Sequence, residues 1–258
     1  MNPKSKLLNS FTSISLNELI NLRWESRTDL KYLVREHDIH NILEDMATKY
    51  RMLEINLFRC FDYETIYFDT PVHQMYSDHQ RGKRSRCKIR IRKYLQTKDC
   101  FLEIKKKTNK NQVVKLRMPH DFHTDKLNDH EQQFILQNSP FYPGELSPKI
   151  RVFFNRLTFI NTEKTEKVTL DLNLSFQDKN RKPDIPGIGI FEVKKSKQLL
   201  KSGFGRIISK YGYFPASFSK YCTGMILLKK AKKYNRFKQN LLTLTKLTGD
   251  RKYIETIS

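Results

Sequence analysis

Long apolar segments are missing from this chain of 258 residues. The longest apolar run, 225–228, is far shorter than the roughly 20 residues that a membrane-spanning helix needs. Residues 1–13 also lack the apolar core of a secretion signal, so we expect no secretory leader. The sequence therefore predicts neither a transmembrane nor a secreted protein.

Cysteine is also scarce, with only Cys60, Cys87, Cys100 and Cys222. None of them forms a C-x-x-C pair or stands at zinc-ligand spacing from a histidine. We expect reduced thiols in a cytoplasmic protein, because a chain of this length buries enough surface to fold without disulfides. The histidines are dispersed, and none pairs with a cysteine or serine in a catalytic pattern.

Internal repeats and low-complexity linkers are absent from the sequence. Proline and glycine are few, and they gather modestly at 140–148 and 183–189, where we expect loops. No change in composition marks a boundary, so we expect residues 1–258 to form a single domain. The segment 226–258 is basic and helical in pattern, and we interpret it as a C-terminal helical extension.

Acidic residues are a minority, with 27 Asp and Glu against 49 Lys and Arg, and the net charge is +22. Such an excess predicts an anionic partner: nucleic acid, an anionic membrane surface or a phosphate-rich small molecule. Apolar residues make up 38% of the chain, so it is not disordered overall.

Charged and apolar residues alternate with the two-residue period of a β-strand in seven segments. At 86–92, for example, basic residues alternate with Cys87, Ile89 and Ile91. We expect strands at 27–34, 65–69, 86–95, 101–107, 113–118, 149–160, 167–176 and 189–195. Helices are expected at 16–22, 38–51, 129–136, 196–211 and 218–233, and the helix at 38–51 has Ile39, Ile42, Leu43 and Met46 on one face.

The charged strand faces have two interpretations: a solvated sheet surface, as antiparallel sheets commonly have, or the inside of a barrel. Two features favour the barrel. Neighbouring lysines and arginines repel one another unless an anion lies between them, and a closed barrel leaves no exposed sheet edges. The fold class that we predict is α+β, with an antiparallel β-barrel tunnel that has a basic lumen and is flanked by helices.

Four carboxylates stand among the basic residues: Asp29, Glu103, Asp171 and Glu192. Each either pairs with a neighbouring lysine or arginine or binds a divalent cation, and both readings stay open. Mg²⁺ or Mn²⁺ is typically held by one or two carboxylates together with phosphate oxygens and waters. A polyphosphate chain with its metal ion suits such a site, because arginine binds phosphate in a bidentate manner and lysine adds point charges.

Eight short motifs resemble the VTC domain, the polyphosphate polymerase branch of the triphosphate tunnel metalloenzymes. The first three are R-T-D-L-K-Y at 27–32, Y-F-D-T at 67–70 and H-x-x-G-K-R-S-R-C-K-I-R-I-R-K-Y from His79. The others follow in family order: L-E-I-K-K-K at 102–107, F-N-R-L-T-F at 154–159, V-T-L-D-L-N-L at 168–174, F-E-V-K at 191–194 and F-S-K-Y at 218–221. The resemblance covers roughly residues 15–225, which would form the tunnel core.

This resemblance implies that a nucleoside triphosphate such as ATP binds in the tunnel with Mn²⁺ or Mg²⁺. Its terminal phosphate passes to a growing polyphosphate chain, and no protein nucleophile is required because a phosphate oxygen of the chain attacks. Carried over by motif, the phosphate-binding residues are Lys31, Arg90, Arg92, Lys105, Lys115, Arg156, Lys194 and Lys220. Arg90, Arg92, Arg156 and Lys194 would act in catalysis, and Glu192 would be the metal ligand.

Three positions depart from the family pattern. Asp29 stands where glutamate is more common, and its shorter side chain reaches less far toward a metal ion. Lys167 replaces a usual arginine, which removes a bidentate contact, and Ser217 stands where some polymerases have another lysine. These departures weaken the expectation of efficient polymerisation more than that of the tunnel and its ligand.

Three functions remain open: a polyphosphate-synthesising transferase, a hydrolase of triphosphate or polyphosphate in the same tunnel, and a non-catalytic binding module for polyphosphate or nucleic acid. Nucleic acid is the less favoured of these ligands, because the basic strand faces carry no aromatics for base stacking. Tyr67, Phe68, Phe153 and Phe191 instead stand at core-like positions.

The basic cluster at 229–238 is either a solvated helix face or a docking surface for anionic lipid. The solvated helix face is the more common case, and relatives in which this domain is joined to a membrane segment are consistent with docking. We accordingly expect a cytoplasmic protein that can lie at the inner face of a membrane, with a membrane-protein partner that receives the polymer.

Overall fold

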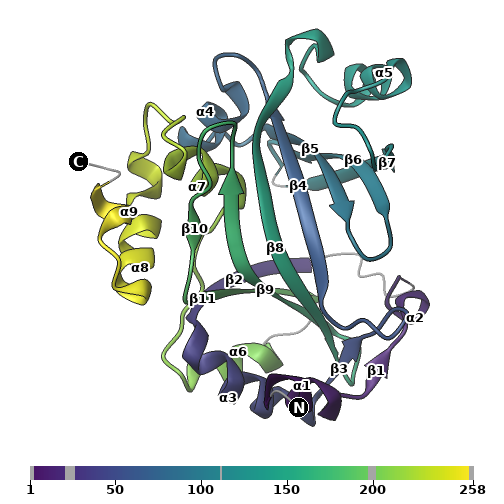
Figure 1. Ribbon diagram of the computed structural model, residues 1–258, viewed down its shortest axis with the longest axis vertical. Helices are drawn as coiled ribbons and strands as arrows, with labels where there is room; N and C mark the ends of the chain where they lie inside the picture. Colours follow the sequence, from purple (N-terminus) through teal and green to yellow (C-terminus); the bar gives the residue numbers. More distant parts are fainter. Residues whose placement is uncertain (1–2, 21–26, 111, 197–201, 256–258) are drawn as a thin grey trace.

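The structure, a computed structural model, describes residues 3–20, 27–110, 112–196 and 202–255. In these residues eleven strands form a single sheet, with helices around it (Figure 1). The main path of the sheet runs β2-β11-β9-β8-β4-β5-β6-β7, and all neighbours along it are antiparallel. The predicted α+β class with a large antiparallel sheet is confirmed.

The strands of the main path are long. They are β2 (Arg27–Arg35), β4 (Phe61–Asp69), β5 (Arg86–Tyr94), β6 (Asp99–Lys107), β7 (Val113–Pro119), β8 (Ser147–Asn161), β9 (Glu166–Gln177) and β11 (Ile188–Ser196). Three short strands extend the sheet: β1 (Ser13–Ile14), β3 (Tyr50–Leu53) and β10 (Asp184–Ile185). The helices are α1 (Pro3–Ser10), α2 (Leu16–Ile20), α3 (Glu36–Ala47), α4 (Gln74–Gln80), α5 (Asp129–Asn138), α6 (Gly203–Ser209), α7 (Lys220–Leu227), α8 (Lys238–Thr248) and α9 (Lys252–Glu255), with single 3₁₀ turns at Pro143–Glu145 and Asn235–Phe237.

The sheet curls until strands that lie far apart along its path face one another. Lys31 on β2 donates to the carbonyl oxygen of Phe218 at 2.6 Å, and Lys88 on β5 donates to the hydroxyl of the next residue, Ser219, at 2.9 Å. Both lysines belong to the basic strand face, so this face is the inside of the curl. Within the described residues β2 and β7 are not hydrogen-bonded to each other, so the wall of the tunnel is not a continuous ring of strand pairs.

Helices α1, α3 and α6 cover the outer face of half of the wall. The apolar stripe of α3, predicted from its 3.6-residue spacing, lies against the alternate residues of the strands that point away from the lumen. This buried cluster includes Ile42 and Met46 from the helix and Phe159, Val168 and Phe191 from β8, β9 and β11. The period-two pattern therefore sorts the strand residues as predicted, with apolar residues outward under helices.

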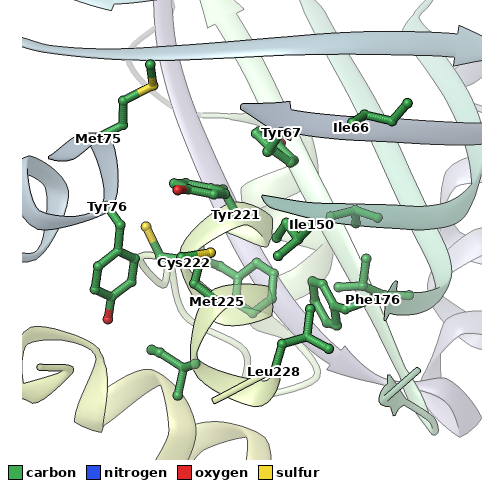
Figure 2. Packing of buried hydrophobic residues seen from close by; sticks show 14 of the residues in the cluster. Ile66, Tyr67, Met75, Tyr76, Ile150, Phe176, Tyr221, Cys222, Met225 and Leu228 are labelled. Carbon is green, nitrogen blue, oxygen red and sulfur yellow. The ribbon is translucent and has the colours of Figure 1, made fainter. Parts of the chain in front are cut away.

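Helix α7 packs on the lumen side at one end of the tunnel. Figure 2 shows Tyr221 beside Tyr67 of β4, and the centroids of the two rings lie 5.0 Å apart. A Cβ atom on Gly224 would lie 2.5 Å from the ring of Phe176 and 2.7 Å from Ile150, so only glycine allows this close approach. Because Tyr67 and Ile150 stand on the lumen face, α7 covers the part of this end that β4 and β8 line.

Several predicted boundaries are wrong. The helix expected at 38–51 ends at Ala47, and residues 50–53 form β3, because they pair with β8. The helix expected at 196–211 is restricted to α6, since Ser196 belongs to β11 and residues 197–201 lie outside the described part. The helix expected at 218–233 ends at Leu227, before Lys229 turns the chain with a positive φ of 53°. Residues 21–22 of the helix expected at 16–22 are likewise outside the description.

The C-terminal helices pack against the rest of the molecule. Leu241 and Leu244 of α8 and Tyr253 of α9 are buried in the same apolar cluster as the strand residues around α7. No helix of the described residues is both long and apolar enough to cross a membrane.

Candidate functional site

Basic side chains form a continuous patch on the lumen face of β5, β6 and β7. Strand register places Lys88 opposite Lys105, and Lys105 opposite Lys115. Directly opposed residues on neighbouring strands have Cβ atoms about 5 Å apart, and like charges at that spacing repel. Among the described residues Lys88 and Lys105 form no salt bridge that would relieve this repulsion. The arrangement suits an anion.

Arg90 and Arg92 share one carboxylate. Nε and Nη2 of Arg90 both lie 2.6 Å from Oε2 of Glu103, and Nη1 of Arg92 lies 3.9 Å away. Burial alone would raise the pKa of Glu103, but Arg90 and Arg92 outweigh it and lower the pKa to about 2. Arg90 also donates to the hydroxyl of Tyr67 at 3.2 Å, and Arg92 to Thr65 at 3.3 Å. Both guanidinium groups are thus held in fixed orientations.

Arg156 of β8 and Lys220 of α7 hold a second carboxylate, that of Asp171 on β9. Nε and Nη2 of Arg156 bind the two oxygens of Asp171 at 2.5 and 2.7 Å, and Lys220, from α7, contacts the same carboxylate. The side chain of Asp171 is fully buried. Burial opposes its ionisation, yet Arg156 and Lys220 keep its pKa well below the usual range. Two cations against one carboxylate leave a net positive charge here.

Glu192 lies in the middle of the tunnel wall. Register places it opposite Lys31 on one side and Thr169 on the other, and its carboxylate is bonded to Lys194. Burial would raise the pKa of Glu192, but Lys194, Lys31 and Arg156 hold it well below its usual value. The carboxylate is therefore ionised at any physiological pH.

Whether these residues fit a divalent cation can be tested on the polar atoms beside Glu192. In the part of the chain that the structure describes, no three His, Cys, Asp or Glu side chains gather into a complete ligand set. However, Oγ1 of Thr169, next to Glu192, is buried and has no hydrogen-bond partner. An ionised carboxylate beside an unsatisfied hydroxyl fits an ion or its water ligand, with the remaining ligands supplied by phosphate oxygens and waters.

Lys105 is one of the lumen lysines whose pKa is lowered. Lys105 is exposed to solvent on the lumen face of β6. Partial desolvation of its ammonium group, followed by the charges of Lys115, Lys88 and Lys31, lowers its pKa to about 7. A bound anion would return the proton to Lys105, so anion binding and protonation are coupled.

Aromatic rings also line the lumen, contrary to the sequence interpretation. The rings of Tyr63 and Phe154 stack at 5.0 Å, and the guanidinium of Arg156 lies 5.2 Å from Tyr63 and 5.1 Å from Phe154. The strand was expected only at 65–69, which leaves Tyr63 out. In the structure β4 begins earlier, at Phe61, and includes Tyr63. Phe154 has the same parity as Arg156 along β8. These rings stack on each other and support the arginine.

The structure brings most of the predicted site residues to one lumen. Lys31, Arg90, Arg92, Lys105, Arg156, Lys194, Lys220 and Glu192 stand on its wall or on α7. Lys115 lies on the edge strand β7 and is exposed, but its charge still acts on Lys105 and Glu103. Of the three departures, Asp29 and Lys167 flank Lys194 in register, and Ser217 is exposed before α7.

Several lumen residues were not among the predicted site residues. Lys88 was recognised as part of the basic face, but its bond to α7 depends on the tertiary fold. For Thr65 and Thr169 the only sequence signal is their place among the alternate residues of β4 and β9 that face the lumen. Of the carboxylates singled out in the sequence, Glu103, Asp171 and Glu192 bind lysine or arginine.

One histidine does meet a cysteine, although the sequence interpretation paired none. Nδ1 of His79, at the end of α4, lies 3.2 Å from Sγ of Cys222 on α7. The two residues are 143 positions apart, so no local motif could have indicated the contact. Both lie at the end of the tunnel where α7 packs.

Comparison with known proteins identifies one family by its sequence profile. The sequence profile of the VTC domain matches residues 26–229. No curated protein matches the chain. Among solved structures, a candidate adenylyl cyclase from Hippeastrum, described as having a dominant triphosphatase activity, is 13% identical, with a TM-score of 0.48 over 77% of this chain and 95% of its own. A candidate adenylate cyclase from Vibrio parahaemolyticus is 14% identical, with a TM-score of 0.46 over 76% of this chain and 96% of its own.

Proposed function

Since this chain belongs to the VTC domain family, we propose that it transfers the terminal phosphate of a nucleoside triphosphate, such as ATP, to a polyphosphate chain inside the tunnel. The observation that carries this proposal is the row of opposed lysines, Lys88, Lys105 and Lys115, which shares one lumen with two arginine clusters, Arg90 and Arg92 on β5 and Arg156 on β8. A linear polyphosphate carries negative charge along its length, and it therefore relieves the repulsion within the whole row.

The proposed mechanism relies on positioning and charge. Arg90, Arg92 and Arg156 are oriented by carboxylates and have planar groups that bind phosphate oxygens in pairs. Lys31, Lys105, Lys115, Lys194 and Lys220 supply point charges that neutralise the phosphates as charge shifts during transfer. Of these, Arg90, Arg92, Arg156 and Lys194 would touch the transferred phosphate. The phosphate oxygen of the acceptor chain is already anionic, so no residue has to remove a proton from it.

Glu192 would hold Mn²⁺ or Mg²⁺ together with phosphate oxygens, with the hydroxyl of Thr169 beside it. Such an ion, when bound, neutralises charge on the phosphate oxygens. Lys194, which bonds Glu192 in the described structure, would then turn to a phosphate oxygen.

The tunnel chemistry supports a transferase more than a hydrolase. A water nucleophile gains from a general base, and a base works best with a pKa near the working pH. The pKa of Glu103 is about 2, and the pKa values of Asp171 and Glu192 are also held low by lysine and arginine. These carboxylates are poor bases, whereas a polyphosphate acceptor needs none. Product analysis with ATP and Mn²⁺, which counts polyphosphate and free phosphate separately, tests this choice.

Location and partner belong to the same proposal. We propose a cytoplasmic enzyme that passes its polymer to a membrane protein and can lie at the inner face of a membrane. In the expected docking cluster at 229–238, Lys230 binds Asp178 at 3.0 Å, and the segment lies between α7 and α8 instead of on a helix face. Nucleic acid is not expected as a ligand, because the lumen rings Tyr63 and Phe154 stack on each other.

Thr169→Val should weaken Mn²⁺ binding in the presence of tripolyphosphate by about tenfold, because residues beside a metal ligand typically contribute that much to metal affinity. The same change should not lower the stability of the free protein, since it removes an unsatisfied buried hydroxyl. Calorimetric Mn²⁺ titration of the tripolyphosphate complex measures the effect. Thr245→Val is the matched control, because Oγ1 of Thr245 on α8 is also buried without a partner. Equal Mn²⁺ affinity in the wild type and Thr169→Val would remove Thr169 from the site.

Lys105→Arg should change the pH dependence of tripolyphosphate binding. With a pKa of about 7, Lys105 loses its charge as the pH rises, whereas arginine stays charged. The affinity of the wild type should therefore fall by about fivefold relative to Lys105→Arg between about pH 7 and pH 8. Titration calorimetry at both pH values measures this ratio. The ligand's own ionisation affects both proteins equally, so it does not contribute to the ratio. Parallel pH curves for the two proteins would show that Lys105 does not titrate in this range.

A further inference from the structure

The line of basic side chains in the lumen continues beyond the first turn of α7, toward the molecular surface. Lys88, which bonds Ser219 at the start of α7, is followed on the same face of β5 by Arg86. Arg236, in the turn between α7 and α8, lies against Gly82 of the loop that precedes β5. Gly82 has a φ of 72° and no side chain, which leaves room for the guanidinium.

These cations surround His79. The ring of His79 packs edge-on against Phe237 at 5.6 Å, next to Arg236 in sequence. Burial, followed by the charges of Lys88, Arg86, Lys31 and Arg236, lowers the pKa of His79 to about 2. His79 is therefore neutral, and one of its two ring nitrogens carries a proton while the other accepts a hydrogen bond.

Cys222 decides which nitrogen carries the proton. Burial raises the pKa of the Cys222 thiol, so its sulfur keeps its proton and can donate to Nδ1 of His79 at 3.2 Å. The proton of the imidazole is then on Nε2. The cluster thus adds a neutral N–H donor to its cations, and such a donor suits an oxyanion.

The carboxylates nearby are already engaged. Asp69 accepts hydrogen bonds from the backbone N–H groups of Met75 and Tyr76 and from the hydroxyl of Tyr221. Asp78 accepts from Gln74 at 2.7 Å and lies 3.4 Å from Lys83. Among the described residues Arg86 and Arg236 form no salt bridge, and Arg86 donates only to the carbonyl oxygen of Lys83, at 2.9 Å.

We propose that Arg86, Arg236 and Nε2–H of His79 form an outer anion site, which binds the phosphates of a linear polyphosphate that extend beyond the lumen at the α7 end. The inference rests on the proposed function and deepens it, because it assigns a direction to the chain. Lys105, Lys88, Arg86 and Arg236 form one line, and a single polyanion neutralises all of them. Under the proposed function tripolyphosphate occupies the lumen cations, and we expect it to leave the outer site empty.

The test compares tripolyphosphate with a longer linear polyphosphate by titration calorimetry on the full chain. The wild type should bind the longer chain more tightly. Arg236→Ala should lose about tenfold of its affinity for the longer chain, the usual effect of one charged hydrogen bond, and keep its affinity for tripolyphosphate. Arg236 is exposed, so the variant is expected to fold. Arg251→Ala, which removes an exposed arginine before α9, is the matched control and should behave as the wild type.

The outcomes separate the outer site from the proposed function. Unchanged affinity of Arg236→Ala for the longer chain overturns the outer site, and so does an equal loss in Arg251→Ala, which would indicate a general charge effect. Single-stranded RNA that binds as tightly as the longer polyphosphate, and equally depends on Arg236, also overturns it. A wild type that binds neither polyphosphate contradicts the proposed function itself.

A spectroscopic readout examines the histidine separately. Nitrogen NMR of the free protein should show His79 with the proton on Nε2, and only the longer polyphosphate should shift that signal. Cys222→Ala removes the thiol donor and should allow the proton to move to Nδ1. A proton on Nδ1 in the wild type would overturn the role of His79.

Discussion

Glu192→Gln should lower turnover at least about a hundredfold, because it removes the charge that anchors the divalent ion at the transferred phosphate. The amide keeps the shape of the side chain, and Arg90, Arg92 and Arg156 keep their own carboxylate partners. Tripolyphosphate binding without metal should be retained or strengthened, since one repelling carboxylate is lost from the lumen. Steady-state turnover across a Mn²⁺ titration, together with tripolyphosphate affinity, measures both effects.

The competing interpretation is that Glu192 only pairs with Lys194. In that case Glu192→Gln would lower stability modestly and leave the Mn²⁺ dependence of turnover near that of the wild type. Asp45→Asn is the matched control, because Asp45 binds Lys210 at 3.0 Å on the outside of the molecule. An active Glu192→Gln enzyme with unchanged Mn²⁺ dependence would end the assignment of Glu192 as metal ligand.

Tripolyphosphate should stabilise the folded protein by about 2.7 kcal/mol at a hundredfold excess over its dissociation constant. For a chain of this size that corresponds to a rise in melting temperature of about 5–10 °C. The physical reason is the repulsion among Lys88, Lys105 and Lys115 in the free protein, which a bound polyanion removes. Thermal melts followed by circular dichroism, with and without tripolyphosphate, measure the shift.

Inorganic phosphate at the same concentration is the control for this shift. A single phosphate contacts only a few of the lumen cations, so it should stabilise the protein much less than tripolyphosphate. Arg90→Ala should reduce the shift, because its guanidinium is already held in the free protein by Glu103 and Tyr67. Melting curves that millimolar tripolyphosphate leaves unchanged would contradict a polyphosphate site in the lumen.

Much of this fold could be predicted because the alternation of side chains between the two faces of a strand is a local property of the sequence. Strands such as β5 and β6 carry their apolar and basic residues on opposite faces, so the sequence alone indicated which of these side chains would share a surface. The resemblance to the VTC domain added the curl that turns this surface into a lumen. The wrong boundaries lie where distant partners decide the structure: Tyr50 and Met52 join β3 because β8 offers them a neighbouring strand.

Features that depend on tertiary contacts could not be predicted. Helix α4 begins where the buried carboxylate of Asp69 binds the backbone of Met75 and Tyr76, and no local cap signalled it. The pair of His79 and Cys222 and the pKa of Lys105 likewise depend on which strands and helices meet at the α7 end. The roles of the predicted phosphate-binding residues stay predictions that the variants above test.

The central claim is that the lumen catalyses phosphate transfer to polyphosphate, and its most direct test is product analysis. Purified protein is incubated with ATP and Mn²⁺, and the polyphosphate and the free phosphate formed are measured separately against the ADP released. Our account predicts polyphosphate that accounts for most of the ADP, and its loss in Glu192→Gln. Free phosphate without polyphosphate would make the protein a hydrolase, and ATP that stays intact would contradict a catalytic tunnel.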